Sequence, residues 1–176
     1  ELAAAIRARR GEKPVVAVAN EQATSAAYWI GSAADRVFIT GETTQVGSIG
    51  VVATHIDISK AREMRGVKLT EITAGRFKRI ASENAPLSQE GRSTIQDEVD
   101  YIYSVFVNDV AKNRNVSVET VLNKMADGRI FLGNDAIEAG LVDGQSTLPA
   151  LIDQLNQERA AQGRVGAIAP NLKLQG

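Results

Sequence analysis

The apolar run in PVVAVAN, residues 14–20, constrains the fold more than any other part of the chain. No polar side chain interrupts it between Val15 and Ala19, and every second residue is valine from Val16 onward. A short continuous run of this kind is typical of a strand that is buried on both faces, as in a parallel sheet. Because parallel strands need crossover connections, the run predicts an α/β fold in which helices alternate with strands.

The remaining patterns agree with this alternation. Apolar side chains from Ile95 to Val110 recur every three or four residues, which predicts one long helix that begins at Ser88. Ser117 is a good N-cap for a short helix, and Gly140 followed by Leu141 is typical of a helix end. The patterns predict further helices over 2–10, 24–34, 57–65 and 146–161, and further strands over 36–40 and 68–73.

Length and composition limit the classes of function. At 176 residues the chain fits one domain, which we expect to span 1–161, with 162–176 as a mobile tail or linker. A net charge of -1 gives no broad basic surface for nucleic acid, and the absence of cysteine excludes disulfides and thiol nucleophiles. The chain contains no run of about 18 apolar residues, so no membrane span is predicted in this fragment.

Ser25 is the candidate nucleophile, because it lies among alanines in ATSAA, directly after the first predicted strand. By composition alone, a helix cap is the more common role for such a serine. A nucleophilic serine needs a base. The single histidine, His55, is one candidate, with Asp57 placed to orient it, and a lysine held neutral by burial is another. Among the lysines Lys78 stands out, since it follows a predicted strand beside Gly75, although a solvated loop lysine is its ordinary interpretation.

Four segments together resemble one family of enzymes. They are ATSAAYWIGSAADRVFIT, VGSIGV, TAGRFKRIASENAPLSQE and ADGRIFLGNDAIEAGLVD, in this order. The chain resembles the Ser/Lys peptidases of the signal peptide peptidase A (protease IV) family over roughly residues 12–155. Each motif alone is weak evidence, but four at compatible spacing are specific.

This resemblance implies a ClpP/crotonase-like α/β fold of repeated β-β-α units with buried strands and outer helices. It implies that Ser25 is the nucleophile and Lys78 the general base, with Ser48 orienting the lysine amine. The backbone N–H of Ala26 is the expected oxyanion donor, although the family has glycine at this position. An upstream P-G-G segment of the family is not in this chain, so we expect 1–161 to be a peptidase domain truncated on its N-terminal side.

Within the family, the connection after GSIG and the helix VDYIYSVFVNDVAKNRNVS most resemble the phage or prophage capsid assembly proteases. That branch implies scaffold and capsid proteins as substrates, in the host cytoplasm or the procapsid. The alternatives are a membrane-attached, extracytoplasmic peptidase that degrades signal peptides, and a non-catalytic assembly module. The family also implies a homo-oligomer with sites that neighbouring subunits share, and it implies neither a metal nor a cofactor.

Overall fold

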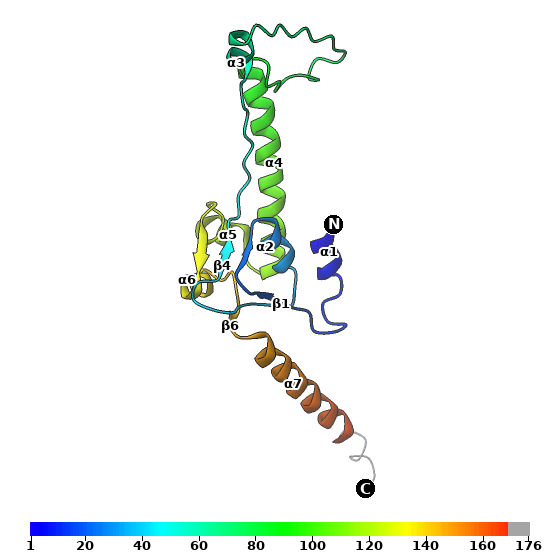
Figure 1. Ribbon diagram of the computed structural model, residues 1–176. Helices are drawn as coiled ribbons and strands as arrows, with labels where there is room; N and C mark the ends of the chain where they lie inside the picture. The colour runs from blue at the N-terminus through cyan, green and yellow to red at the C-terminus, as the bar shows by residue number, and fades with distance from the viewer. Residues whose placement is uncertain (169–176) are drawn as a thin grey trace. The chain divides into compact units, whose positions relative to one another are not determined.

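The computed structural model describes residues 1–168, and it describes the side chains of residues 1–161 (Figure 1). The chain divides into two compact units. The first contains residues 1–49 and the described residues from 107 onward, and the second contains Gly50–Phe106. Helices and short strands are mixed along the chain, which confirms the α/β prediction.

The first unit contains two small sheets. One sheet has the order β1-β3-β6 and is parallel throughout. Its strands are β1 (Val16–Ala19), β3 (Arg36–Ile39) and β6 (Gly144–Gln145). The first two are the strands that the apolar patterns predict. Val37 and Ile39 of β3 are buried, but β1 is an edge strand in which only Ala19 is buried, so the prediction that this strand is covered on both faces is wrong.

The second sheet has the order β2-β4-β5 and positions the candidate site. Its strands are β2 (Gln22–Thr24), β4 (Gln45–Gly47) and β5 (Ile130–Leu132). β2 runs parallel to β4, with Thr24 opposite Gly47, and β5 runs antiparallel to β4. The pairing therefore brings together the chain segments that follow residues 24 and 47.

Helices make up the rest of the first unit. They are α1 (Leu2–Arg7), α2 (Ala26–Gly31), α5 (Val118–Lys124), α6 (Gly133–Glu138), α7 (Leu148–Ile168) and the last part of α4 (Gln89–Arg114). α7 extends away from the sheets, with only Leu151 buried among its described side chains (Figure 1). The Oγ of Ser117 accepts a hydrogen bond from the N–H of Thr120, which confirms the predicted N-cap. Leu141 is fully buried and its N–H donates to the carbonyl of Ala136, as the predicted helix end requires.

Two polar interactions fix these helices, and the first of them is buried. The hydroxyl of Tyr28, a fully buried residue of α2, donates to the carbonyl of Leu141 at 2.8 Å. Arg114 makes two hydrogen bonds to Asp143, at 2.7 and 3.0 Å. Burial raises the pKa of Asp143, but its hydrogen bonds with Arg114 and the N–H of Val37 outweigh burial and hold that pKa below the ordinary value.

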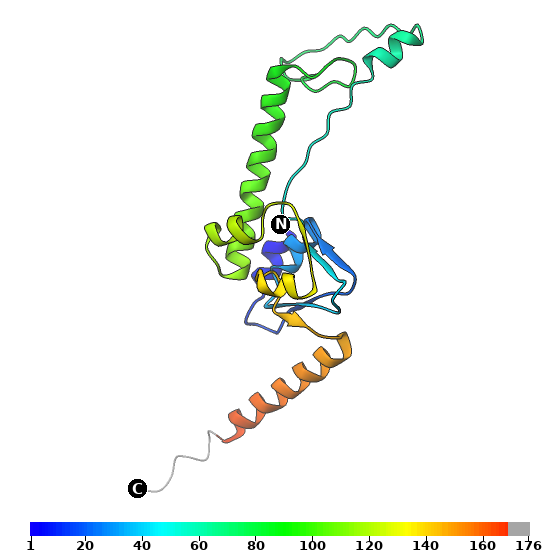
Figure 2. The same cartoon turned by 90° about the vertical axis from the view of Figure 1, so that its left-hand side faces the viewer.

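The second unit has little buried surface. It contains α3 (Ser59–Met64), extended segments on both sides of α3, a run of turns near residue 80 and the first part of α4. α4 is one uninterrupted helix (Figure 2). Burial along its predicted apolar stripe begins only at Phe106, because Ile95 and Val99 are half-buried and Ile102 is exposed.

Two predicted elements differ from the structure. The strand predicted over 68–73 is wrong, because its side chains are exposed and its backbone joins no ladder in the residues that the structure describes. An alternating pattern becomes a strand only beside a pairing partner. The last helix continues to Ile168, past the expected boundary at 161, and residues 169–176 of the expected tail lie outside the described part. No helix in the described chain has the length and apolar character that a membrane crossing needs.

Candidate active site

Ser25 lies at the junction between β2 and α2, in an unusual backbone conformation. Its φ is 54° and its ψ is -124°, which are the angles of the first central residue of a type II′ turn, where glycine predominates. Ser25 is the N-cap of α2 by position, but its side chain makes no cap hydrogen bond, and the residue is exposed. The structure therefore does not support the capping interpretation, and it leaves the Ser25 hydroxyl accessible.

Backbone hydrogen bonds fix Ser25 on both sides. Its N–H donates to the carbonyl of Gly47 at 2.8 Å, which extends the pairing of β2 with β4 by one step. Its carbonyl accepts from the N–H of Trp29 at 2.9 Å, in the first turn of α2. A strained residue persists only when its surroundings hold it, and such residues cluster at functional sites.

Ser48 follows β4 as Ser25 follows β2, and it is also left-handed, with φ at 52°. Neighbouring strands lie about 4.8 Å apart, so the register places the two serines side by side at the carboxyl ends of paired parallel strands. The N–H of Ser48 donates to the carbonyl of Arg129 at 2.8 Å. Gly47 has a φ of 92°, and a Cβ there would lie 3.0 Å from the Phe131 ring, so glycine is needed at this crowded position.

Lys78 belongs to the second unit and lies in a turn. Its N–H donates to the carbonyl of Gly75, and its side chain is exposed. The turn packs closely on the start of α4, because a Cβ at Gly91 would lie 2.5 Å from the carbonyl oxygen of Ile80. The structure thus gives Lys78 a defined backbone but no cover over its amine.

Two ion pairs hold this turn. Arg76 binds Glu90 of α4, and its guanidinium lies over the ring of Phe77, 5.1 Å from the centroid. Arg79, which follows the candidate base, binds Glu71, and the hydrogen bond from its guanidinium lowers the pKa of that carboxyl. Ion pairs of this kind are individually weak at exposed sites, but together they restrict a loop.

The structure thus brings Ser25 and Ser48 together through strand pairing, and Ala26 follows as the first residue of α2. Lys78 belongs to the other compact unit. Its partnership with Ser25 remains a prediction from the sequence. Strained backbone angles at both serines are the features that sequence reasoning missed, because serine carries no signal for a positive φ.

The alternative base has different partners. A ring nitrogen of His55, Nε2, lies 3.0 Å from the carbonyl oxygen of Ser82, within the second unit. Asp57 accepts a hydrogen bond from the N–H of Ser59 at 2.9 Å, and hydrogen bonds from Ser59 are the main cause of its lowered pKa. No hydrogen bond joins His55 to Asp57 in the described residues, so the orienting contact of a Ser–His–Asp triad is missing.

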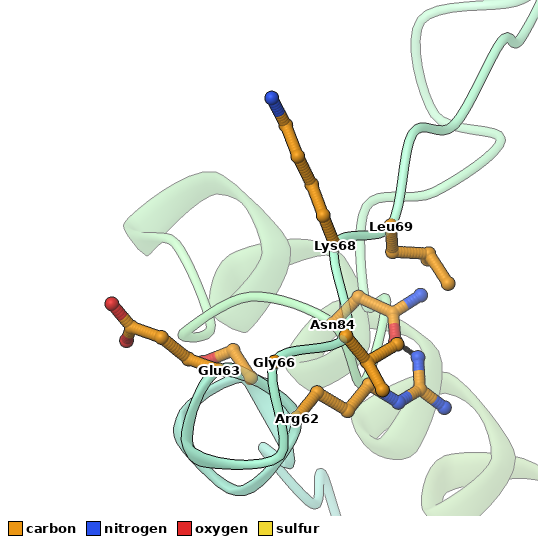
Figure 3. A pocket seen from close by; sticks show the side chains of 8 residues that line it. Arg62, Glu63, Gly66, Lys68, Leu69 and Asn84 are labelled. Carbon is orange, nitrogen blue, oxygen red and sulfur yellow. Dashed lines mark hydrogen bonds between the residues drawn. The ribbon is translucent and has the colours of Figure 1, made fainter.

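One hollow in the surface of the second unit lies away from the candidate nucleophile and the candidate lysine. A cavity of about 350 Å³ lies between α3 and the segment that follows it, where Arg62 and Asn84 contact each other and the Lys68 side chain extends outward (Figure 3). It contains none of the predicted site residues. Among the described residues, no group of three or more histidines or acidic side chains could hold a metal ion.

Comparison with known proteins identifies the family. Residues 7–162 match the profile of Peptidase family S49. The chain is 37% identical over 146 residues to an Enterococcus faecium protein that carries the name signal peptide peptidase SppA. It is 35% identical over 134 residues to the capsid assembly protease C of Escherichia phage lambda, and 30% identical over 145 residues to protease 4 of Haemophilus influenzae.

These alignments cover 83%, 76% and 82% of this chain, but 42%, 30% and 23% of the respective relatives. The chain therefore spans less than half the length of these relatives. The family profile covers most of the chain and includes Ser25, Ser48 and Lys78. The chain belongs to Peptidase family S49, the family of the signal peptide peptidases that its four motifs predict.

Proposed function

We propose that the protein is a serine endopeptidase in which Ser25 is the nucleophile and Lys78 the general base. One observation carries the proposal. Ser25 is exposed, its side chain caps nothing, and it is held in a strained conformation beside Ser48 at the end of a parallel strand. A purely structural cap would use its hydroxyl and would not require these backbone angles.

The proposed mechanism is acyl transfer. The neutral amine of Lys78 accepts the proton of the Ser25 hydroxyl while Oγ attacks the peptide carbonyl. The C–N bond breaks, the lysine returns the proton to the leaving amine, and an acyl-enzyme remains. Lys78 then takes a proton from water, which attacks the ester, and passes that proton to Ser25 Oγ as the acyl C–O bond breaks and the product acid leaves. Ser48 orients the lysine amine, and the N–H of Ala26 is one donor to the oxyanion.

The arrangement also supports a ClpP/crotonase-like fold. Ser25, the proposed nucleophile, follows β2, which is parallel to β4. Ser48, the proposed lysine-orienting serine, follows β4 directly. The evidence for this finer assignment is the order of the motifs, the family membership and the parallel pairing of β2 with β4.

The exposure of the second unit supports a homo-oligomer with shared sites. A lysine acts as a base only when desolvation keeps its amine neutral, yet the Lys78 side chain is exposed in the single chain. The same unit exposes many large apolar side chains, and such surfaces mark contacts with other chains. They are Val52, Ile56, Met64, Val67, Leu69, Ile72, Phe77, Tyr101 and Ile102. A second copy that covers this unit would bury both the apolar side chains and the amine.

The dyad is tested with three variants of the full-length protein in a peptidase assay. Ser25→Ala and Lys78→Ala should each abolish cleavage, and His55→Ala should keep it. Full activity of Lys78→Ala together with loss in His55→Ala would replace the dyad with the triad. Activity that survives Ser25→Ala would remove Ser25 as nucleophile, and a wild type that never cleaves would favour a non-catalytic assembly module.

The shared site is tested by mixing two inactive variants. Subunits carrying Ser25→Ala provide the intact lysine, and subunits carrying Lys78→Ala provide the intact serine. If sites are shared, refolding the two together restores part of the wild-type rate. If each site belongs to a single chain, the mixture stays inactive although size-exclusion chromatography shows a mixed oligomer.

For the biological role we propose capsid maturation, in which the enzyme cleaves scaffold and other procapsid proteins in the host cytoplasm or the procapsid. Two observations support this role. They are the similarity to the phage lambda capsid assembly protease C and the resemblance of the connection after GSIG to the phage proteases. The alternative is an extracytoplasmic, membrane-attached peptidase that degrades released signal peptides, supported by the similarity to the Enterococcus faecium protein.

The two roles differ in substrate. A capsid protease should cleave the scaffold and capsid proteins encoded next to it at defined positions, and it should leave a panel of signal peptides largely intact. Rapid degradation of the signal peptides with no cleavage of scaffold or capsid proteins would reverse the assignment.

A further inference from the structure

Arg10 makes an unusual set of contacts at the far end of the helix that follows Ser25. Its Nε donates to the carbonyl of Ala33 at 2.9 Å, and its Nη2 donates to the carbonyls of Ser32 and Ala34 at 3.0 and 2.5 Å. Nη2 also donates to the carbonyl of Asn113 at 2.9 Å. One guanidinium therefore joins the end of α2 to the last turn of α4.

The position of these carbonyls explains why arginine suits the site. The three carbonyls belong to Ser32, the C-cap of α2, and to the two residues after it, where the helix has ended and no helical N–H reaches them. They lie at the negative end of the helix dipole, where a cation is favourable. A guanidinium has a fixed planar set of donors and can bind several carbonyls at once, whereas an ammonium is a point charge on a flexible stem. The contacts hold residues 32–34 in place through three consecutive carbonyls.

Two more contacts join α2 to α4 in the same unit. The side-chain amide of Asn113 donates to the Oγ of Ser32 at 3.0 Å, and both residues are buried. The indole Nε1 of Trp29 donates to Asp109 at 3.0 Å. The end of α2 is thus fixed on several sides, and Arg10 supplies most of its backbone contacts.

α2 is only six residues long, so little separates these contacts from Ser25. The N–H of Ser25 is fixed to β4, and the residues after it belong to the helix. If the end of α2 could move, the helix would turn about Ser25 and its backbone could relax toward ordinary negative φ angles.

We propose that Arg10 is a positioning residue, which keeps Ser25 in its strained, exposed conformation by fixing the carboxyl end of α2. The proposal rests on the proposed function in one respect, that Ser25 is the nucleophile. Arg10 touches neither substrate nor reacting atoms in this role, and it acts only through α2.

The neighbouring arginine is a matched control. Arg9 is exposed and its Nη1 binds Glu12 three residues later, and no hydrogen bond or ion pair joins its side chain to residues 26–34 in the described chain. Arg10→Met and Arg9→Met remove the same charge from adjacent positions and keep an apolar stem. Only the first removes the contacts to residues 32–34.

The decisive measurement is a thermodynamic cycle on urea unfolding of the full-length protein, which does not depend on activity. Ser25→Gly and Ser25→Ala are each made alone, with Arg10→Met and with Arg9→Met. Glycine should be more stable than alanine at position 25 when Arg10 is present, since glycine tolerates the strained angles. We expect this advantage to fall by at least half with Arg10→Met and to stay unchanged with Arg9→Met. An equal advantage in all three backgrounds overturns the proposal.

Kinetics give the second readout. In the Ser25 background, at a temperature where each variant is fully folded, Arg10→Met should lower kcat about tenfold or more with KM within about twofold. Arg10→Lys should recover only a small part of this loss, and Arg9→Met should retain the wild-type rate. An unchanged kcat in Arg10→Met with only a lower melting temperature also overturns the proposal. If instead Ser25→Ala remains active, the proposed function fails, while the unfolding cycle still decides the role of Arg10.

Discussion

The most direct test of the site compares glycine with alanine at position 25. Both substitutions remove the hydroxyl, so both should abolish cleavage by the proposed mechanism. They differ in the backbone, because Ser25 has a φ of 54° and a ψ of -124°. Alanine must adopt these angles against its Cβ, whereas glycine adopts them at no steric cost.

The size of the difference follows from two opposing terms. A non-glycine residue in a sparsely populated region costs about 1–3 kcal/mol, which Ser25→Gly relieves and Ser25→Ala keeps. Glycine loses more chain entropy on folding, which costs about 0.5–1 kcal/mol relative to alanine. The midpoints of the two ranges leave Ser25→Gly more stable than Ser25→Ala by about 1 kcal/mol. For a chain of this length that corresponds to a rise of about 2–4 °C in Tm.

Urea unfolding, followed by circular dichroism, measures this difference directly. Ser93 is the control, because it is exposed in the helical part of the second unit, where glycine should be less stable than alanine by about 1 kcal/mol. The order of the two variants should therefore be opposite at positions 25 and 93. If Ser25→Ala is as stable as Ser25→Gly, Ser25 is not strained and the main structural support for its role is lost.

Three other changes test the framework around the site. Tyr28→Phe removes a buried hydroxyl that donates to a carbonyl at 2.8 Å, and should lower the free energy of unfolding by about 1–3 kcal/mol, whereas the exposed Tyr101→Phe should change it little. Asp143 is bound by Arg114 and has a lowered pKa, so its contribution to stability is complete above the unfolded pKa of about 3.9 and is lost as the pH falls through the lower folded value. Wild type should therefore lose stability on acidification more steeply than Asp143→Asn, and equal slopes in urea titrations at pH 2–6 would contradict this. At Gly91 an added Cβ would lie 2.5 Å from a backbone carbonyl of the turn that carries the candidate base, so Gly91→Ala should lower kcat at least tenfold, and an unchanged kcat would show that the turn does not need this contact.

The sequence predicted well those secondary-structure features that depend on neighbouring residues. The uninterrupted apolar run became β1, and Ser117 caps α5 with its own hydroxyl. The helix end at Gly140 has the left-handed glycine and the buried Leu141 that its motif requires. Each of these depends on residues within about five positions of one another, so a single sequence contains all the information that they need.

The features that the sequence did not predict depend on distant partners. β2 is three residues long and is defined only by its pairing with β4, more than twenty residues later. The alternation over 68–73 is a strand pattern without a neighbouring strand in the described residues. The angles of Ser25 and Ser48 follow from how their strands enter the next segment, and nothing in the serine side chain reveals them. The motif resemblance named these serines, but only the backbone gives a physical reason to consider them functional.

The two proposed catalytic residues differ in how much of their required environment one chain provides. For Ser25 the single chain provides nearly everything, since β4 fixes one side of its backbone and α2 the other. For Lys78 it provides a turn held by ion pairs, but leaves the side chain exposed. Because a lysine base must be desolvated, the missing component is a cover over the amine. Activity should therefore depend on protein concentration in the range where subunits associate, and the strained geometry of Ser25 should persist in the dissociated subunit.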